Sequence, residues 1–351
     1  MDYATIYTST IFGLDYPTLW FLVVGGVFSG YAILDGFDLG AGALHLFFKK
    51  EENRRVALNA VGPVWDGNEV WLVIGGGTLF AGFPKVYASL FSGLYVPFML
   101  FVALLIFRAV SIEFRSKEPM AWWRKTWDTV YMVSSTGLAI ALGAVMGNVL
   151  QGIPINEAGD YVGNGWDFLN PYAILVGLTT LAMFMMHGAL YLALKTEGAM
   201  NEFVGIWVKR SIIAFIIMFI LTTGYTMLFV DHMVDRMKEI PAFLLVPVVA
   251  LLSIANIPRL VEKRNWTMAF VFSALTVSMM FVLSAIGLYP TLLISTVDPA
   301  YSLDVYNSAA SQKTLGIMLL MAGIGAPLVL LYTFIVYRSF RGTVKIDEHS
   351  Y

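Results

Sequence analysis

The chain has 351 residues, of which 58% are hydrophobic and only 13% are charged. This composition is typical of an integral membrane protein. The absence of cysteine excludes a disulfide framework, a thiolate metal site and a sulfur nucleophile. The net charge of -2 and the scattered basic residues exclude an electrostatic surface for nucleic acid, so no nucleic-acid partner is expected.

Apolar segments follow one another along the chain, each long enough to cross about 30 Å of hydrocarbon. They lie at 17–47, 55–82, 85–114, 122–152, 171–195, 199–230, 240–261, 266–290 and 312–337. We therefore predict an all-α integral membrane protein with nine transmembrane helices, arranged as two four-helix bundles plus one peripheral helix.

The same pattern predicts the organisation of the chain. Residues 17–152 form a first bundle of four helices that carries an acidic cluster, and residues 171–290 form a second bundle of four. Residues 312–351 supply the ninth helix and a cytoplasmic tail. The segments expected outside the membrane are the N-terminal segment 1–16 and the loops 153–170 and 291–311.

The distribution of basic residues predicts the orientation. If the nine segments cross in alternating directions, eighteen of the 22 Lys and Arg residues fall on one side. The other side receives only Lys85, Arg236, Lys238 and Lys313. Because basic loops stay in the cytoplasm, the N-terminus is predicted outside and the C-terminus in the cytoplasm.

Acidic residues interrupt the first two predicted helices at a similar depth. Asp35 and Asp38 are three positions apart, and so are Asp66 and Glu69, so each pair is expected to share a helical face. An ionised carboxylate in hydrocarbon costs several kcal/mol, so such groups usually face protein, water or a proton path. The two pairs predict an acidic cluster in the half of the membrane nearer the cytoplasm.

Two interpretations of this cluster, which includes Asp128 of the fourth helix, stay open from the residues alone. In one, the carboxylates are structural and bond to Arg108, to Asn68 and to the indole N–H groups of Trp65 and Trp127. In the other, they form a proton conduit that opens to the cytoplasm. Arg108 is the expected charge partner in either case.

Histidine placement argues against a haem or metal in this chain. The four histidines are His45, His187, His232 and His349, and only His187 lies well inside a predicted helix. Two axial histidines at matching depth are therefore missing, and no ligand spacing for a catalytic metal is present. Small residues also stand four apart at Gly36 and Gly40, which predicts a close helix approach.

Several longer motifs belong together. They are GYAILDGFDLGAG, VGPVWDGNEVWLV, GTLFAGFPKVYA, FRSK, WRKTWD, GNVLQGIP and LNP. With them the chain resembles subunit II of the cytochrome bd quinol oxidase family, from the first helix to the C-terminus and most densely over 30–154. The WDGNE and DGFDLG elements are specific and do not recur by chance.

The resemblance implies a subunit of a quinol:oxygen oxidoreductase that pairs with a larger subunit I. That partner would carry haems b558, b595 and d, and would oxidise ubiquinol or menaquinol while dioxygen is reduced to water. The consumed protons would come from the cytoplasm, so proton-motive force would arise without pumping. A bacterial cytoplasmic membrane, bound lipid and quinone, and small single-helix accessory subunits are also implied.

The resemblance also implies roles for individual residues. Asp66 is expected to relay protons, and Trp65 is expected to support the haem site at the subunit interface. The remaining carboxylates expected to serve the proton path or its surroundings are Asp35, Asp38, Glu69 and Asp128.

Two alternatives come from other functional classes. Pro63 and Pro97 inside predicted helices, beside intramembrane carboxylates, are also typical of an ion-coupled secondary transporter. Such a carrier would work without a haem partner. A third possibility is a purely structural scaffold for the haem subunit, in which the carboxylates only fold the interface.

Overall fold

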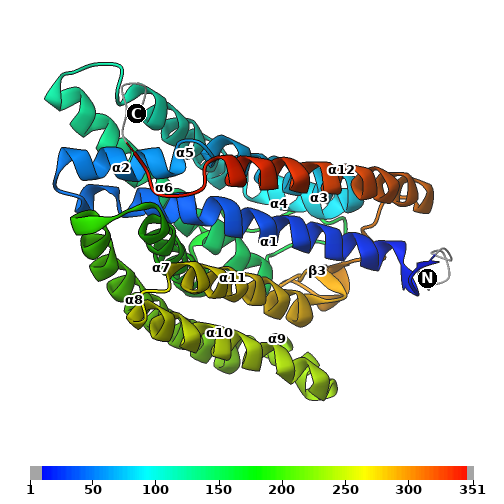
Figure 1. Ribbon diagram of the computed structural model, residues 1–351. Coiled ribbons are helices and arrows are strands. Elements are labelled where there is room, and N and C mark those ends of the chain that lie inside the picture. Colours follow the sequence, from blue (N-terminus) through cyan, green and yellow to red (C-terminus); the bar gives the residue numbers. More distant parts are fainter. Residues whose placement is uncertain (1–9, 346–351) are drawn as a thin grey trace.

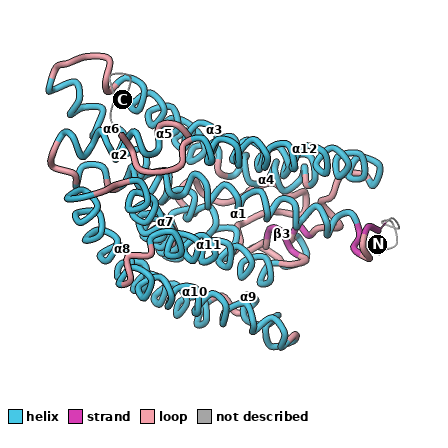
Figure 2. The backbone as a smooth tube through the Cα atoms, viewed as in Figure 1, coloured by secondary structure: helices cyan, strands magenta, loops and turns pink. Residues whose placement is uncertain are grey.

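The computed structural model describes residues 10–345, without the side chains of 236 and 237. The expectations for 1–9 and 346–351, including His349, lie outside the described residues. Helices make up most of the described chain, and the strands form two short hairpins (Figure 2). These hairpins pair β1 (Thr10–Ile11) with β2 (Leu14–Asp15), and β3 (Thr291–Leu293) with β4 (Leu303–Asp304). The predicted all-α class is confirmed.

The helices follow in chain order. They are α1 (Tyr16–Ala43), α2 (Glu51–Val61), α3 (Trp65–Gly82), α4 (Pro84–Gly93), α5 (Tyr95–Phe114), α6 (Ala121–Gln151), α7 (Pro171–Lys195), α8 (Gly198–Phe229), α9 (His232–Glu239), α10 (Leu245–Glu262), α11 (Trp266–Leu288) and α12 (Gln312–Ser339). Short 3-10 turns are η2 (His45–Phe47), η3 (Asp167–Leu169), η4 (Pro241–Leu244) and η5 (Pro299–Tyr301).

Eight helical stretches in the described part of the chain are long and apolar enough to cross a membrane. The chain is therefore a multi-pass membrane protein. The expectation of one continuous helix over 55–82 is wrong, because α2 ends at Val61 and α3 begins at Trp65. Pro63 between them has no backbone N–H and interrupts the helical hydrogen bonds. The apolar run 85–114 is likewise divided, at Leu94.

Helix α1 lies at the centre of the fold and contacts α3, α6, α7 and α11 (Figure 1). Its approach to α7 is close, because a Cβ on Gly40 would overlap the carbonyl of Phe184 and a Cβ on Gly188 would overlap the backbone of α1. A Cβ on Gly36 would meet the ring of Phe184 at 2.7 Å. The predicted close approach at Gly36 and Gly40 is confirmed, and it draws the polar part of α1 into the protein interior.

Helix α12 covers this interior only loosely. It contacts α1 and α3, and within it Leu315 is the buried residue. The chain after α12 is fastened to the α7–α8 connection, since the backbone N–H of Val344 donates to the carbonyl of Lys195 at 2.9 Å. The hydroxyl of Thr343 donates to Glu197 at 2.8 Å. The end of α12 is therefore held across the bundle.

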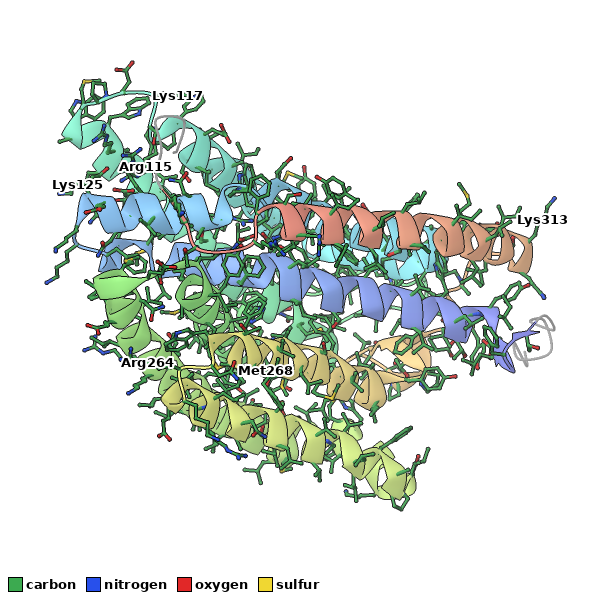
Figure 3. All side chains as sticks on the ribbon, viewed as in Figure 1. Arg115, Lys117, Lys125, Arg264, Met268 and Lys313 are labelled. Carbon is green, nitrogen blue, oxygen red and sulfur yellow. The ribbon has the colours of Figure 1, made fainter. Side chains whose placement is uncertain are left out.

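The two ends of the molecule differ in charge. The start of α1 lies at one end of the molecule, and α12 runs from that end toward the other (Figure 1). Arg115, Lys117 and Lys125 lie toward the end to which α12 points, and Lys313 lies at the end from which it starts (Figure 3). This placement agrees with the basic asymmetry in the sequence.

Candidate functional site

A buried ion pair joins α1 to α5 in the interior. Asp35 lies about 12 Å before the end of α1 and Arg108 about 9 Å before the end of α5. Both guanidinium Nη atoms of Arg108 donate to Asp35, at 2.6 and 3.0 Å. Both side chains are 0% exposed, and Glu69 Oε2 of α3 lies 3.6 Å from Arg108 Nη1. We call Asp35, Glu69 and Arg108 the arginine cluster.

A second set of polar contacts, separate from the arginine cluster, links α1 through α3 to α12. Asn68 Nδ2 donates to Asp38 Oδ2 at 2.8 Å and to the carbonyl of Leu34 at 3.1 Å. The hydroxyl of Tyr337 donates to Asn68 Oδ1 at 3.0 Å. Asp38 is 0% exposed, so these contacts connect a fully buried carboxylate to the last helix. Sequence reasoning did not identify Tyr337, since nothing in its local pattern reveals a partner so distant in the chain.

Asp66 does not join these contacts. It is exposed in the first turn of α3, where the helix dipole favours a negative charge. Asp66 lies within electrostatic reach of Glu69, but Glu69 turns toward Arg108. Val70 and Val73, one and two turns further along the same face, are exposed as well. Asp66 and Glu69 were expected to lie together on one helical face of the acidic cluster. Glu69 joins the cluster, whereas Asp66 points away from it.

Trp65 directly precedes Asp66 and points inward. Its side chain is 8% exposed and packs with Leu58, Ile112 and Tyr131. Because α3 begins at Trp65, this packing fixes the start of the helix and with it the outward direction of Asp66.

Asp128 belongs to a separate group near the basic end of the bundle. It accepts from His45 Nε2 at 2.5 Å, from Arg115 Nε at 2.5 Å and from Arg54 Nη1 at 3.1 Å. Arg115 also donates to Glu51 at 2.9 Å. Burial alone would lower the pKa of Arg115, but the hydrogen bonds and charges of Asp128 and Glu51 raise it above its ordinary value. We call this group the Asp128 cluster.

Four members of the Asp128 cluster were not predicted as such from the sequence: His45, Glu51, Arg54 and Arg115. Arg54 and Arg115 were attributed to the membrane orientation, and His45 was considered only as a haem ligand. Their common position at one end of the bundle was the feature of the sequence that could have predicted the cluster. The indole of Trp127, which the structural interpretation expected to bond a carboxylate, has a buried Nε1 without a hydrogen-bond partner.

The contacts of His187 bear on whether it can bind a haem or a metal. His187 is 0% exposed, with Nδ1 at 2.6 Å from Ser273 Oγ and Nε2 at 3.0 Å from the carbonyl of Ile33. Its ring also stacks on Phe270. Both ring nitrogens are therefore engaged by protein. Within residues 10–345, no group of three or more His, Cys, Asp or Glu side chains is arranged to hold a metal ion.

Chemically, the site is a set of carboxylates that can hold or pass protons. Asp38 and Asp35 are buried, Glu69 is 21% exposed on its side chain, and Asp66 is exposed. The arrangement is graded from the surface of α3 to the interior of α1. Acidic groups arranged in this way within a membrane are typical of proton relays.

Comparisons with known proteins agree with each other. The family model described as "Cytochrome bd terminal oxidase subunit II" matches residues 16–340. The chain is 32% identical over 371 residues to the "Cytochrome bd-I ubiquinol oxidase subunit 2" of Escherichia coli (strain K12), covering 95% of this chain and 97% of that protein. It is 32% identical over 333 residues to the "Cytochrome bd ubiquinol oxidase subunit 2" of Bacillus subtilis (strain 168), covering 94% and 97%.

A solved structure shares the fold. A chain in the structure of bd oxidase from Geobacillus thermodenitrificans superposes with a TM-score of 0.76 at 20% identity, covering 93% of this chain and 98% of that one. The family match spans every element of the carboxylate site, from α1 to α12. The chain belongs to the cytochrome bd terminal oxidase subunit II family.

Proposed function

We propose that this chain serves as subunit II of a bacterial cytoplasmic-membrane oxidase that oxidises quinol and reduces dioxygen to water. The relatives named as ubiquinol oxidase subunits support a quinol substrate, either ubiquinol or menaquinol. In this proposal the chain crosses the membrane nine times, as two four-helix bundles and a peripheral helix. Its N-terminus lies outside and its basic end faces the cytoplasm.

The observation that carries the proposal is the exposed face of α3. Asp66, Val70 and Val73 lie on this face, so without a partner a carboxylate would stand among apolar side chains toward lipid. A charge in that position is costly, and such residues almost always face protein or water. We infer that the larger subunit I covers this face and that Asp66 lies at the junction of the two subunits.

Redox cofactors belong to that partner in this proposal. His187, the histidine well inside a helix, uses both ring nitrogens in contacts with protein, which supports placing the haems elsewhere. We assign haems b558, b595 and d to subunit I. Small single-helix accessory subunits, bound lipid and quinone complete the proposed complex.

The contribution of this chain is then proton delivery from the cytoplasm. We propose that Asp66 relays protons across the subunit junction, while Asp35, Asp38 and Glu69 store them or hold its surroundings. Asp128, paired with two guanidinium groups and His45, would secure the cytoplasmic end of the path. Trp65 would support the haem site indirectly by fixing the start of α3.

The assembly is tested by isolation from the native membrane. The tagged chain is purified in mild detergent, a reduced-minus-oxidised absorption spectrum is recorded, and co-purifying chains are identified by mass spectrometry. A larger haem-bearing partner with a long-wavelength haem d band is expected. A colourless and monodisperse preparation without a partner would contradict the assignment.

The proton role is tested with Asp66→Asn. We expect normal haem content with oxygen turnover reduced about tenfold or more, in the range of a lost proton-transfer group. Asp160→Asn, an exposed carboxylate in the loop after α6, is the matched control and is expected to leave turnover unchanged. Unchanged turnover in Asp66→Asn would instead favour the scaffold alternative. Membership of the oxidase family decides against the ion-coupled transporter.

A further inference from the structure

Four buried polar atoms without hydrogen-bond partners gather around the arginine cluster. They are Tyr31 Oη, Asp38 Oδ1, Glu69 Oε2 and Arg108 Nε. The side chains of Asp38 and Arg108 are 0% exposed, and Tyr31 is 2% exposed. More than nine in ten buried polar groups in proteins find a partner in protein or ordered water, so four unpaired atoms in one place require an explanation.

These atoms border one region between α1, α3 and α5. Tyr31 lies within electrostatic reach of Arg108 and Glu69, and its hydroxyl faces Asp35 in a contact that falls short of a well-formed hydrogen bond. Asp38 lies within reach of the same three charged groups. The separation of 3.6 Å between Arg108 Nη1 and Glu69 Oε2 is too long for a direct hydrogen bond, and a polar contact of that length is often bridged by water.

The chemistry of the four atoms matches water. Arg108 Nε can only donate, the two carboxylate oxygens accept, and the Tyr31 hydroxyl can do both. A water molecule both donates and accepts, and a buried one typically makes about three hydrogen bonds to otherwise unpaired groups. A metal cation fits less well. The guanidinium of Arg108 would repel it, and Arg108 Nε, which can only donate, would still have no acceptor.

We propose that ordered water occupies this region and joins the arginine cluster to the Asp38–Asn68–Tyr337 contacts. The arginine cluster and the Asp38–Asn68–Tyr337 contacts then form one hydrogen-bonded network from Glu69 to the last helix. Tyr31 is a positioning residue in this network, because its hydroxyl anchors the water without taking part in a proton transfer. No protein hydrogen bond alone makes this connection among the described side chains.

The network supplies a route between the two carboxylates, a consequence that rests on the proposed proton-delivery function. The water accepts a proton from one of the two carboxyl groups and gives a different proton to the other. One O–H bond breaks and one forms at each step, so no further reactant is needed. Glu69 is partly exposed and Asp38 fully buried, so the water connects the interior carboxylate with the exposed face of α3.

The first test is a structure of the whole purified complex at a resolution that reveals water, about 2 Å. We expect density within 2.6–3.2 Å of at least two of the four unpaired atoms. Direct pairing of these atoms with one another, or with side chains of the partner subunit, with no solvent density between them, would overturn the proposal.

The second test uses infrared difference spectra of the complex recorded in ordinary and ¹⁸O-labelled water. An O–H band that shifts with ¹⁸O is expected, and Tyr31→Phe is expected to remove or displace it. Tyr172→Phe is the matched control, because that buried hydroxyl bonds Thr226 at 2.8 Å, away from the cluster. An ¹⁸O-sensitive band that is the same in both variants would overturn the role of Tyr31, and the absence of any such band would overturn the water site.

The two proposals fail separately. If the water band responds to Tyr31→Phe while Asp66→Asn keeps full turnover, the water site stands and proton delivery by this chain falls. If Asp66→Asn slows turnover and no labelled band exists, the proton function stands and the water site is overturned.

Discussion

The buried Asp35–Arg108 pair should behave as one energetic unit. In Arg108→Met, the carboxylate of Asp35 loses hydrogen bonds of 2.6 and 3.0 Å while remaining 0% exposed. Removing one partner of such a pair costs about 3–5 kcal/mol, because a charge is left buried and uncompensated. In Asp35→Asn, Arg108 keeps Glu69 at 3.6 Å, so the expected loss is smaller, about 1–3 kcal/mol.

The double variant separates this reasoning from simple packing. With both charges removed, no unpaired ion remains, so its loss should be well below the sum of the two single losses. The expected coupling energy is at least about 2 kcal/mol. The assay is unfolding of the purified chain in mixed micelles of mild detergent with increasing dodecyl sulfate, monitored by circular dichroism.

An exposed pair of opposite charges serves as the control. Lys238 and Asp235 in α9 lie 3.0 Å apart, but their side chains are 71% and 55% exposed. A coupling energy below about 1 kcal/mol is expected for Lys238→Met with Asp235→Asn. If the Asp35–Arg108 coupling is no larger than that of the exposed pair, the argument from burial is refuted.

Three further variants test the contacts around the site by the same unfolding assay. Tyr337→Phe removes one hydrogen bond to Asn68 and should cost about 1 kcal/mol, whereas no change would mean that the bond contributes nothing. Asp128→Asn should cost about 3 kcal/mol or more, because its cationic partners lose their shared carboxylate; a loss below 1 kcal/mol would contradict this. Gly40→Ala should cost about 3 kcal/mol by forcing α1 from α7, whereas Gly25→Ala meets nothing within 4 Å and should be neutral; equal effects would refute the close approach.

The class of fold was accessible from the sequence because each crossing helix must be long and apolar. Ranges such as 171–195 coincide with the observed helix, since Asn170 caps it and Pro171 begins it. The interruption before Trp65 was less accessible. Pro63 gave the signal, but apolar residues continue on both sides, and hydropathy does not distinguish one long helix from two.

The candidate site was accessible only in part. The spacing of Asp35 and Asp38 correctly placed two carboxylates inside the bundle, and Arg108 stood at a suitable depth. The outward direction of Asp66 depends on how α3 rotates after the break, which is set by the packing of Trp65 and not by spacing. The links through Tyr337 and Tyr31 depend on tertiary contacts that no local pattern encodes.

Proton uptake during a single turnover distinguishes proton delivery through this chain from a purely structural role. The fully reduced complex is mixed with oxygen in weakly buffered solution, and a pH-sensitive dye reports proton uptake while absorption reports the haems. We expect uptake in Asp66→Asn to slow about tenfold or more at unchanged haem content, with Asp160→Asn matching the unsubstituted complex. Uptake in Asp66→Asn at the rate of the unsubstituted complex would contradict proton delivery through this chain.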